Sequence, residues 1–266
     1  MIFTAAGTQD GRGLVRALLD AGYEVAASVV SSYGRRILQG MTDSSSLRII
    51  DEAMDEAALE QYLRQHDVTA FVDATHPYAV NITRNAMTAC HAAHVPYIRY
   101  ERDLSQLTYD RIRIVHSYEE AARAAVEAGQ NIFVTTGSRN LVHLVQVLRT
   151  LSPAARVIAR VLPTVEAMQI CEEAGLLPAQ IAAMQGPFSL EMNREMYRHY
   201  AADVIITKNS GTIGGTDTKL AAAESLGLPV VLIDRPHLDY DHVAHTAQEV
   251  IDFVRDAQSS RRMIQS

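Results

Sequence analysis

The sequence predicts an α/β protein with two Rossmann-like, doubly wound parallel-sheet domains that face a central cleft. Short apolar runs rich in β-branched residues alternate with helical stretches along the whole chain. The apolar runs are continuous rather than alternating, which is typical of a parallel sheet covered on both faces. Both halves also contain a strand that ends in a Gly-bearing loop before a helix, at residues 1–13 and 131–140.

The first half alternates predicted strands and helices from its first residue. The strands are MIFTA, YEVAASVV, LRII, TAFVDA and PYIRY, and the helical stretches between them include residues 14–21, 55–65 and 79–93. A polar stretch without clear periodicity follows at residues 101–110. We expect a domain boundary there, because a chain of 266 residues exceeds the roughly 150 residues of a typical domain.

The second half resumes the same alternation. Its predicted elements are RIRIV, a helix at 118–128, NIFVTT, a helix at 141–150, strands near 155–161, 181–184, 203–207 and 229–233, and a terminal helix near 246–257. The predicted domains are therefore residues 1–107 and 108–266. The terminal helix could pack back on the first domain, and the sequence leaves that open.

The composition limits which binding partners and which cellular location we expect. A net charge of -7 argues against a nucleic-acid partner, which would need a surplus of Lys and Arg on one face. No apolar run approaches the ~20 residues of a membrane helix, and the N-terminus lacks the pattern of a signal peptide, so we expect a cytoplasmic location. The two cysteines lack metal-ligand spacing, so we expect buried thiols and no metal site. The oligomeric state stays open.

The first Gly-rich loop is the predicted cofactor site. Gly7, Thr8 and Gly11 lie between the first strand and the first helix, where backbone amides can approach a pyrophosphate. A plain strand-to-helix turn is the alternative. After the second strand, Ser31 and Arg35 stand where an NAD site usually offers an acidic residue, which favours NADPH over the alternative NADH. In the second half, Thr136, Gly137 and Ser138 repeat the phosphate-loop pattern.

Polar residues follow the fourth strand in the segment DATHPYA. Asp73, His76 and Tyr78 would point toward the cleft from the carboxyl edge of the sheet. Two interpretations of this segment stay open. It could only cap the following helix, or it could cap the helix and also contact the substrate.

Basic and aromatic residues at other strand ends suit an anionic, flat ligand. Arginines are bidentate partners for carboxylate or phosphate, and an aromatic ring on a Gly-Pro turn can stack on a flat molecule. The flexible Gly-rich loop near residue 214 is bracketed by two lysines. The alternatives are that the arginines form surface ion pairs, that the aromatic ring belongs to the core, and that the loop between the two lysines is a solvated turn. The candidate substrate-binding residues are Asp73, Arg99, Arg102, Arg160, Gly186, Pro187, Phe188, Lys208, Gly214, Gly215 and Lys219.

The motifs AAGTQDGR, SSYGR, DATHPYA, YIRYER, TTGSRN, RVLP, MQGPFSLEMN and TKNSGTIGGTDTK, followed by IDRP, together resemble the precorrin-6A reductase family of cobalamin biosynthesis. The resemblance spans nearly the whole chain. It implies pyridine-nucleotide-dependent reduction of precorrin-6A or cobalt-precorrin-6A, a polycarboxylate tetrapyrrole, to the dihydro product. The chain departs from the family where the usual Gly-Gly-Thr is Ala6-Gly7-Thr8, while Asp10 keeps an acidic residue before the next glycine.

For the reduction, the cofactor delivers the hydride. The proton can come from solvent or from a side chain, and His76 and Tyr78 are the candidate donors. Two alternative functions remain open at this stage. One is a nucleotide-sugar or glycosyl-transfer enzyme of paired Rossmann architecture, and the other is a non-catalytic NAD(P)-sensing module.

Overall fold

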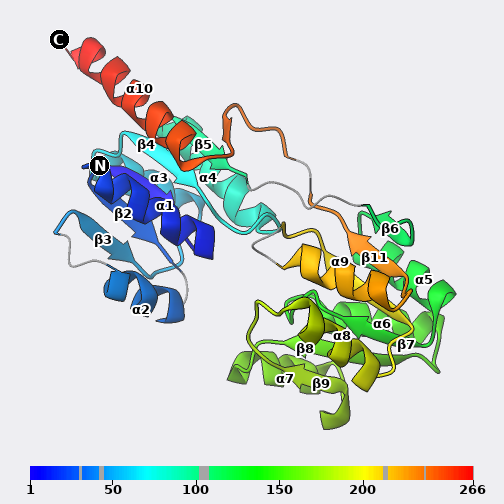
Figure 1. The fold of residues 1–266 in the computed structure, drawn as a ribbon. Coiled ribbons are helices and arrows are strands. Elements are labelled where there is room, and N and C mark those ends of the chain that lie inside the picture. The colour runs from blue at the N-terminus through cyan, green and yellow to red at the C-terminus, as the bar shows by residue number, and fades with distance from the viewer. Residues whose placement is uncertain (30–31, 42–44, 102–107, 212–214, 237, 266) are drawn as a thin grey trace. The chain divides into compact units, whose positions relative to one another are not determined.

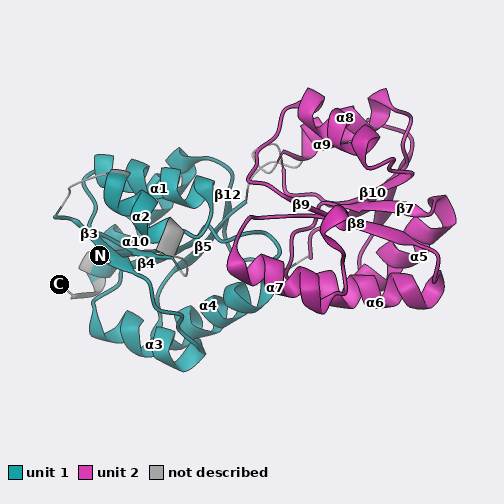
Figure 2. Cartoon of the chain, turned by 90° about the horizontal axis from the view of Figure 1, so that it is seen from below, with its two compact units in different colours: residues 1–102, 237–266 teal, residues 103–236 magenta. Residues whose placement is uncertain are grey.

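The computed structural model divides the chain into two compact α/β units (Figures 1 and 2). It describes residues 1–29, 32–41, 45–101, 108–211, 215–236 and 238–265. Unit 1 comprises Met1–Arg102 and His237–Ser266, and unit 2 comprises Asp103–Pro236. Each unit holds a six-stranded parallel sheet, which confirms the predicted fold class.

Unit 1 has the strand order β12-β5-β4-β1-β2-β3, the doubly wound arrangement of dinucleotide-binding domains. Its elements are β1 (Ile2–Ala5), α1 (Gln9–Asp20), β2 (Val25–Ser28), α2 (Ser32–Met41), β3 (Leu47–Ile50), α3 (Glu56–Gln65), β4 (Ala70–Asp73), α4 (Val80–Ala93), β5 (Tyr97–Tyr100), β12 (Val243–Ala244) and α10 (Ala247–Gln265). The order reverses between β1 and β4, so the loops that follow these two strands lie side by side at the carboxyl edge.

Alternate residues of the unit 1 strands point into two cores. One core buries Leu14 and Leu18 of α1, Leu38 of α2 and Val250 of α10 against the sheet. The other buries apolar side chains of α3 and α4 against Phe3 and Phe71. Helices therefore cover both faces of the sheet, as continuous apolar strands require.

The C-terminal segment belongs to unit 1, which corrects the predicted 108–266 domain. β12 pairs in parallel with β5, and α10 packs its buried Val250 and Val254 on the core beside α1. The terminal helix thus packs on the first domain, the alternative that the sequence left open. Its apolar face completes a core that the first hundred residues leave uncovered.

Unit 2 has the strand order β6-β11-β10-β7-β8-β9. Its elements are β6 (Ile112–Val115), α5 (Tyr118–Ala128), β7 (Asn131–Val134), α6 (Leu141–Leu151), β8 (Arg156–Val161), α7 (Val165–Glu173), the 3-10 turn η1 (Pro178–Gln180), β9 (Ile181–Ala183), α8 (Leu190–His199), β10 (Val204–Lys208), α9 (Thr216–Ser225) and β11 (Val230–Ile233). Helices α8 and α9 cover one face, with Met196, Tyr197 and Leu220 buried against Phe133 and Ile205. The order reverses between β7 and β10, so the loops that follow these two strands lie side by side at the carboxyl edge of the sheet.

Candidate functional site

The first Gly-rich loop joins β1 to α1 at the switch point of unit 1. Thr8 caps α1, because its Oγ1 accepts a hydrogen bond from the Gly11 amide at 3.0 Å. The same hydroxyl donates to the Ala74 carbonyl oxygen at 3.0 Å and so ties the loops after β1 and β4 together. Gly7 is exposed, and a Cβ there would meet no atom within 4 Å. The loop therefore presents an accessible backbone before a capped helix, as a phosphate site needs.

Gly11 has a packing role in this loop. A Cβ at Gly11 would lie 2.9 Å from the Ala6 Cα and 3.1 Å from the Ala74 carbonyl oxygen. Glycine is therefore needed where α1 meets the two loops. Ala6, the departure from the family's double glycine, is fully buried, and its methyl group packs in the core with Leu14 and Leu18.

Arg35 lies on α2, and its guanidinium forms an ion pair with Asp51, the residue after β3. Both side chains are exposed, so the pair is open to exchange with another anion. Ser31, the other residue predicted to favour NADPH, lies outside the described residues.

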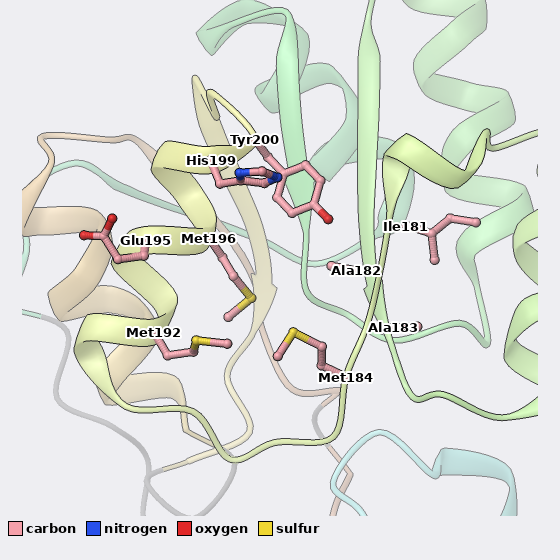
Figure 3. A pocket seen from close by; sticks show the side chains of 9 residues that line it. All are labelled: Ile181, Ala182, Ala183, Met184, Met192, Glu195, Met196, His199 and Tyr200. Carbon is pink, nitrogen blue, oxygen red and sulfur yellow. The ribbon is translucent and has the colours of Figure 1, made fainter.

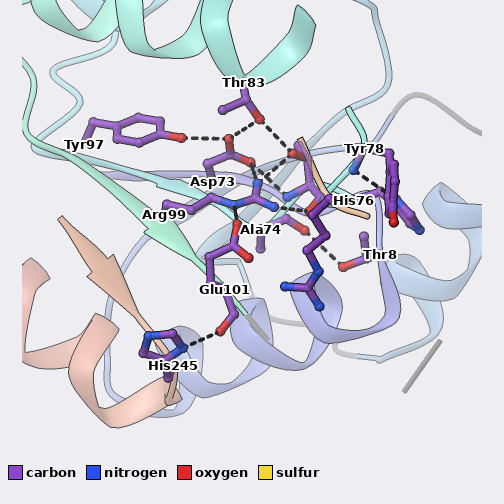
Figure 4. A network of polar contacts seen from close by, with 12 residues as sticks. Thr8, Asp73, Ala74, His76, Tyr78, Thr83, Tyr97, Arg99, Glu101 and His245 are labelled. Atoms are coloured by element: carbon purple, nitrogen blue, oxygen red, sulfur yellow. Dashed lines mark hydrogen bonds and ion pairs between the residues drawn. The ribbon is translucent and has the colours of Figure 1, made fainter. Parts of the chain in front are cut away.

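Asp73 and Arg99 form a buried ion pair beneath the loop that follows β4 (Figure 4). Arg99 Nη1 lies 2.8 Å from Asp73 Oδ1, and the side chains are 1% and 0% exposed. Asp73 also accepts hydrogen bonds from the Thr75 amide at 2.9 Å and from Thr83 Oγ1 and Tyr97 OH at 2.8 Å each. The geometry therefore directs the Asp73 carboxylate into the protein.

Arg99 uses its remaining donors on the protein as well. Nη1 and Nη2 donate to the hydroxyl and carbonyl oxygens of Thr75 at 2.9 and 3.1 Å, and Nε donates to Glu101 Oε1 at 2.8 Å. Burial lowers the pKa of Arg99, but the Asp73 and Glu101 carboxylates outweigh burial and raise the pKa overall. For Tyr97, burial and then the Asp73 charge raise the phenol pKa. The pair fixes the loop after β4 from below.

His76 and Tyr78 are carried by this fixed loop. His76 is exposed and Tyr78 half-buried, with ring centroids 5.6 Å apart. The Tyr78 amide donates to His76 Nδ1 at 3.3 Å, which favours the neutral tautomer with its proton on Nε2. Figure 4 places both rings beside Thr8, at the carboxyl edge of β1 and β4. These side chains can reach a ligand held on the first loop.

In unit 2 the second buried arginine makes a hydrogen bond and a ring contact with neutral groups. Arg160, on β8, is 7% exposed; its Nη1 donates to Asn193 Oδ1 at 2.6 Å, and its guanidinium lies 4.5 Å from the centroid of the Phe188 ring. Among the described residues, no carboxylate contacts Arg160. Burial lowers the pKa of its guanidinium.

Lys219 experiences the positive charges of Arg160 and of a second lysine, Lys208. Lys208 ends β10, with Nζ 5.6 Å from the Tyr118 ring centroid, and Lys219 lies on α9. Burial, followed by the positive charges of Arg160 and Lys208, lowers the pKa of Lys219 to about 7. We call Arg160, Lys208 and Lys219 the cationic cluster. Positive charge at the carboxyl edge of a sheet attracts an anion.

The loops around the cationic cluster are joined to one another. Gly215 caps α9 with φ of 69°, in the left-handed region that favours glycine. Thr218 Oγ1 donates to the Phe188 carbonyl oxygen at 3.0 Å, and Asn193 Nδ2 donates to the Ser189 carbonyl oxygen at 2.9 Å. Gly186 and Pro187 precede Phe188 in the same connection, so the structure brings these predicted residues together. Gly214 and Arg102 lie outside the described residues.

The second predicted phosphate loop follows β7. Thr136, Gly137 and Ser138 are half-buried, and Gly137 has φ of 80°. The Ser138 carbonyl oxygen accepts from the Leu141 amide at 2.9 Å at the start of α6. The loop lies at the switch point of unit 2, next to the end of β10.

Sequence reasoning missed several supporting residues. Thr83, Tyr97 and Glu101 hold the Asp73–Arg99 pair, and Thr218 joins the Phe188 loop to α9. The period-two spacing of Tyr97, Arg99 and Glu101 at the end of β5 is a signal that these side chains share one face.

A separate apolar groove lies between β9 and α8 (Figure 3). It has a volume of about 390 Å³ and is lined by Ile181, Ala182, Ala183, Met184, Met192, Glu195, Met196, His199 and Tyr200. None of the predicted site residues lines it. Its one acidic side chain and lack of Lys or Arg do not suit a polycarboxylate ligand.

Three further features concern metal sites, membrane-spanning helices and thiols. Within the described residues, no group of three or more His, Cys, Asp or Glu side chains is placed to hold a metal ion. No helix in that part of the chain is long and apolar enough to cross a membrane. Cys90 and Cys171 are free and buried, and burial raises the pKa of both thiols.

The strand order and first loop of unit 1 define a Rossmann-type α/β protein, the class that includes dinucleotide-dependent oxidoreductases. The family described as "Precorrin-6x reductase CbiJ/CobK" matches residues 1–255. The chain belongs to this family of reductases.

Similar proteins agree with this assignment over nearly the full length. A cobalt-precorrin-6A reductase of Priestia megaterium is 38% identical, covering 94% of this chain and 96% of its own. A precorrin-6A reductase of Rhodobacter capsulatus is 28% identical over 98% of each chain. The solved structure of CobK precorrin-6A reductase has a TM-score of 0.77 at 26% identity and covers 96% of each chain.

Proposed function

We propose that this reductase uses a pyridine nucleotide to reduce the macrocycle of precorrin-6A or cobalt-precorrin-6A in cobalamin biosynthesis. The single observation that carries the proposal is membership, over residues 1–255, of a family whose similar members are named for these two substrates. It favours a reductase over the glycosyl-transfer and nucleotide-sensing alternatives.

The first loop of unit 1 fits the cofactor pyrophosphate. Gly7 leaves the backbone accessible, Thr8 caps α1, and Gly11 allows the close approach of the helix to the loop after β4. The helix N-terminus offers amide donors and a partial positive charge to a phosphate. When bound, the nicotinamide supplies the hydride. The alternative phosphate site is the loop at 136–138. If replacing Gly7 by a bulky residue leaves the affinity for the nucleotide unchanged, this alternative is favoured.

NADPH is the proposed cofactor, and Arg35 is its proposed discriminating residue together with Ser31. The exposed Arg35 guanidinium can exchange Asp51 for a 2′-phosphate. Arg35→Gln should raise KM for NADPH about tenfold or more and leave KM for NADH nearly unchanged. An equal effect on both cofactors, measured by initial rates, contradicts this role.

The substrate carboxylates are proposed to bind the cationic cluster, with Phe188 packing on the macrocycle. Arg160 is buried among neutral partners, so a ligand carboxylate would compensate its charge. Arg102, Gly186, Pro187, Gly214 and Gly215 remain proposed contacts. Asp73 and Arg99 are proposed to shape the loop after β4 instead of touching the substrate, because their polar atoms are engaged with the protein.

His76 and Tyr78 remain the proposed proton donors. Their loop is fixed by Arg99, and His76 Nε2 is left as the ring donor. His76→Ala should lower kcat without loss of NADPH affinity, whereas an unchanged kcat removes His76 from this role.

The decisive experiment follows NADPH and NADH oxidation by absorbance with precorrin-6A and with cobalt-precorrin-6A. Oxidation that requires one of these macrocycles supports the proposal and identifies the branch. Nucleotide binding without oxidation in the presence of either macrocycle overturns it.

A further inference from the structure

Asn193 anchors the buried arginine of unit 2. It lies in the first turn of α8 and is 1% exposed, and its Oδ1 accepts a hydrogen bond from Arg160 Nη1 at 2.6 Å. A buried amide is stable when both its oxygen and its nitrogen meet partners. The contacts at the two ends of this side chain therefore indicate what the position requires.

The nitrogen end of the Asn193 amide faces acceptors. Nδ2 donates to the Ser189 carbonyl oxygen at 2.9 Å and lies 3.4 Å from the Phe188 carbonyl oxygen. Thr218 Oγ1 of α9 donates to the same Phe188 oxygen at 3.0 Å and lies 3.4 Å from Nδ2. Oxygen atoms thus lie around Nδ2, whereas Oδ1 meets a donor of Arg160. An amide satisfies both sides, whereas a carboxylate offers acceptors alone.

The same amide fixes the guanidinium against an aromatic ring. Phe188 directly precedes the N-cap of α8, and the Arg160 guanidinium lies 4.5 Å from the centroid of its ring. A Cβ on Gly186 would lie 3.1 Å from Phe188 Cε2, so the ring packs against the turn that carries it. Asn193 contacts both the guanidinium and the Phe188 connection, and it therefore holds the charge and the ring in one arrangement.

The two buried arginines differ in the charge of their partners. Arg99 contacts the carboxylates of Asp73 and Glu101 at 2.8 Å each, so its charge is compensated within the protein. In the part of the chain that the structure describes, the contacts of Arg160 are with an amide oxygen and a ring, and both groups are neutral. A hydrogen bond to an amide holds a guanidinium without cancelling its charge. The charge of Arg160 is therefore available to an anion at the carboxyl end of β8.

We propose that Asn193 is a positioning residue for the substrate, because its neutral amide holds the Arg160 guanidinium beside Phe188 and leaves the positive charge of Arg160 for a carboxylate of the macrocycle. The inference rests on the proposed function for the class of ligand. Asn193 acts through Arg160 and does not itself need to touch the ligand. A carboxylate in place of the amide would form an ion pair with Arg160 and compete with the ligand for its charge.

Two substitutions separate the charge of the anchor from its hydrogen bonds. Asn193→Leu keeps the approximate size of the side chain and removes its hydrogen bonds, whereas Asn193→Asp keeps an acceptor for Arg160 and adds a negative charge. The proposal predicts that Asn193→Asp binds a polycarboxylate more weakly than Asn193→Leu. A residue that only stabilises the fold predicts the opposite order, because Asn193→Leu is the variant that leaves Arg160 without its hydrogen bond.

The probe is uroporphyrin I, an octacarboxylate macrocycle, titrated by fluorescence into the full-length protein. The affinity should fall at least about tenfold for Asn193→Asp and about threefold for Asn193→Leu. Gln169→Glu is the matched control, because it adds one negative charge at an exposed position of α7 in the same unit. The affinity of this control should stay within about twofold of wild type. Circular dichroism verifies that each variant is folded.

An affinity of Asn193→Asp that equals or exceeds that of Asn193→Leu overturns the proposal, as does a wild-type protein that does not bind uroporphyrin I. Arg160→Gln is a second test, which leaves Asn193 in place and applies even if Asn193→Asp does not fold. It should lower the affinity at least about tenfold, and an unchanged affinity overturns the proposal. Absence of turnover with both precorrin-6A forms, with the expected order of affinities, would instead overturn the proposed function and leave the role of Asn193 standing.

Discussion

Arg99 illustrates how a strand-end arginine can hold a loop in place from within the protein. Its guanidinium contacts Asp73, Thr75 and Glu101, so each donor group meets an acceptor within the protein. Loss of the guanidinium would leave the fully buried Asp73 carboxylate without its charge partner. Removing one member of a buried pair is far more damaging than the pair's net contribution suggests.

We predict that Arg99→Met lowers the free energy of unfolding by about 3–5 kcal/mol, measured by urea denaturation. Arg16→Met is the matched control, because Arg16 and Asp20 form an exposed pair on α1 and its loss should cost less than about 1 kcal/mol. Similar values for the two variants would show that burial does not set the cost.

Lys219 predicts a second residue-scale effect, on stability and pH. Its pKa is about 7 in the folded protein, below that of an unfolded lysine, so the unfolded chain binds more protons between these values. The destabilisation from Lys219 is complete below pH 7 and is relieved as pH rises toward 10. Lys219→Met should therefore raise the Tm of the ligand-free protein more at pH 6 than at pH 9.5. A pH-independent difference between Lys219→Met and wild type would contradict a lowered pKa, and Lys219→Arg supplies the control for a charge that does not titrate.

At the scale of the element, α1 carries two helical glycines with opposite surroundings. Gly11 lies against Ala6 and the Ala74 carbonyl oxygen, whereas a Cβ on Gly13 would meet no atom within 4 Å. Gly11→Ala should destabilise the protein by about 1–3 kcal/mol through overpacking, and it should weaken NADPH binding because the loop must shift. Gly13→Ala should stabilise it by about 0.5–1 kcal/mol. Thermal unfolding and nucleotide titration of the two variants check these predictions. Equal changes in stability for Gly11→Ala and Gly13→Ala would contradict the packing role of Gly11.

Element positions were predictable where local pattern determines them. Continuous apolar runs indicated β1, β4, β7 and β10, because a strand covered on both faces needs apolar residues throughout. The expected helix at 14–21 begins earlier, at Gln9, because Thr8 caps it. β12 escaped prediction, since a two-residue strand has no periodicity and exists only through its pairing with β5.

The strand-end positions of the candidate site residues were predictable from the sequence, but their contacts with one another were not. Asp73 and Arg99 lie 26 positions apart, and only the pairing of β4 with β5 reveals that they meet each other. Likewise, the lowered pKa of Lys219 arises from burial and from the positive charges of Arg160 on β8 and Lys208 on β10. Such effects depend on tertiary contacts, which residue type and spacing do not encode.

At the scale of the whole molecule, unit 1 is assembled from both ends of the chain. Ala244, Val250 and Val254 are fully buried in its core. A chain ending at residue 236 should lose the cooperative unfolding of unit 1 and expose apolar surface, whereas unit 2, continuous in sequence, should keep its own transition. Calorimetry of the truncated and full-length chains checks this, and an unchanged pair of transitions would show that α10 is dispensable.

The return of the C-terminal segment also sets an order for synthesis. A ribosome makes the first five strands of unit 1 early, yet the strand and helix that complete its sheet and core are made only after unit 2. Domains usually fold as units in the order in which they are made. Here the second unit is complete first, so the nascent N-terminal half must wait with an open sheet edge beside β5 until β12 and α10 have been made, a period in which chaperone binding would be most valuable.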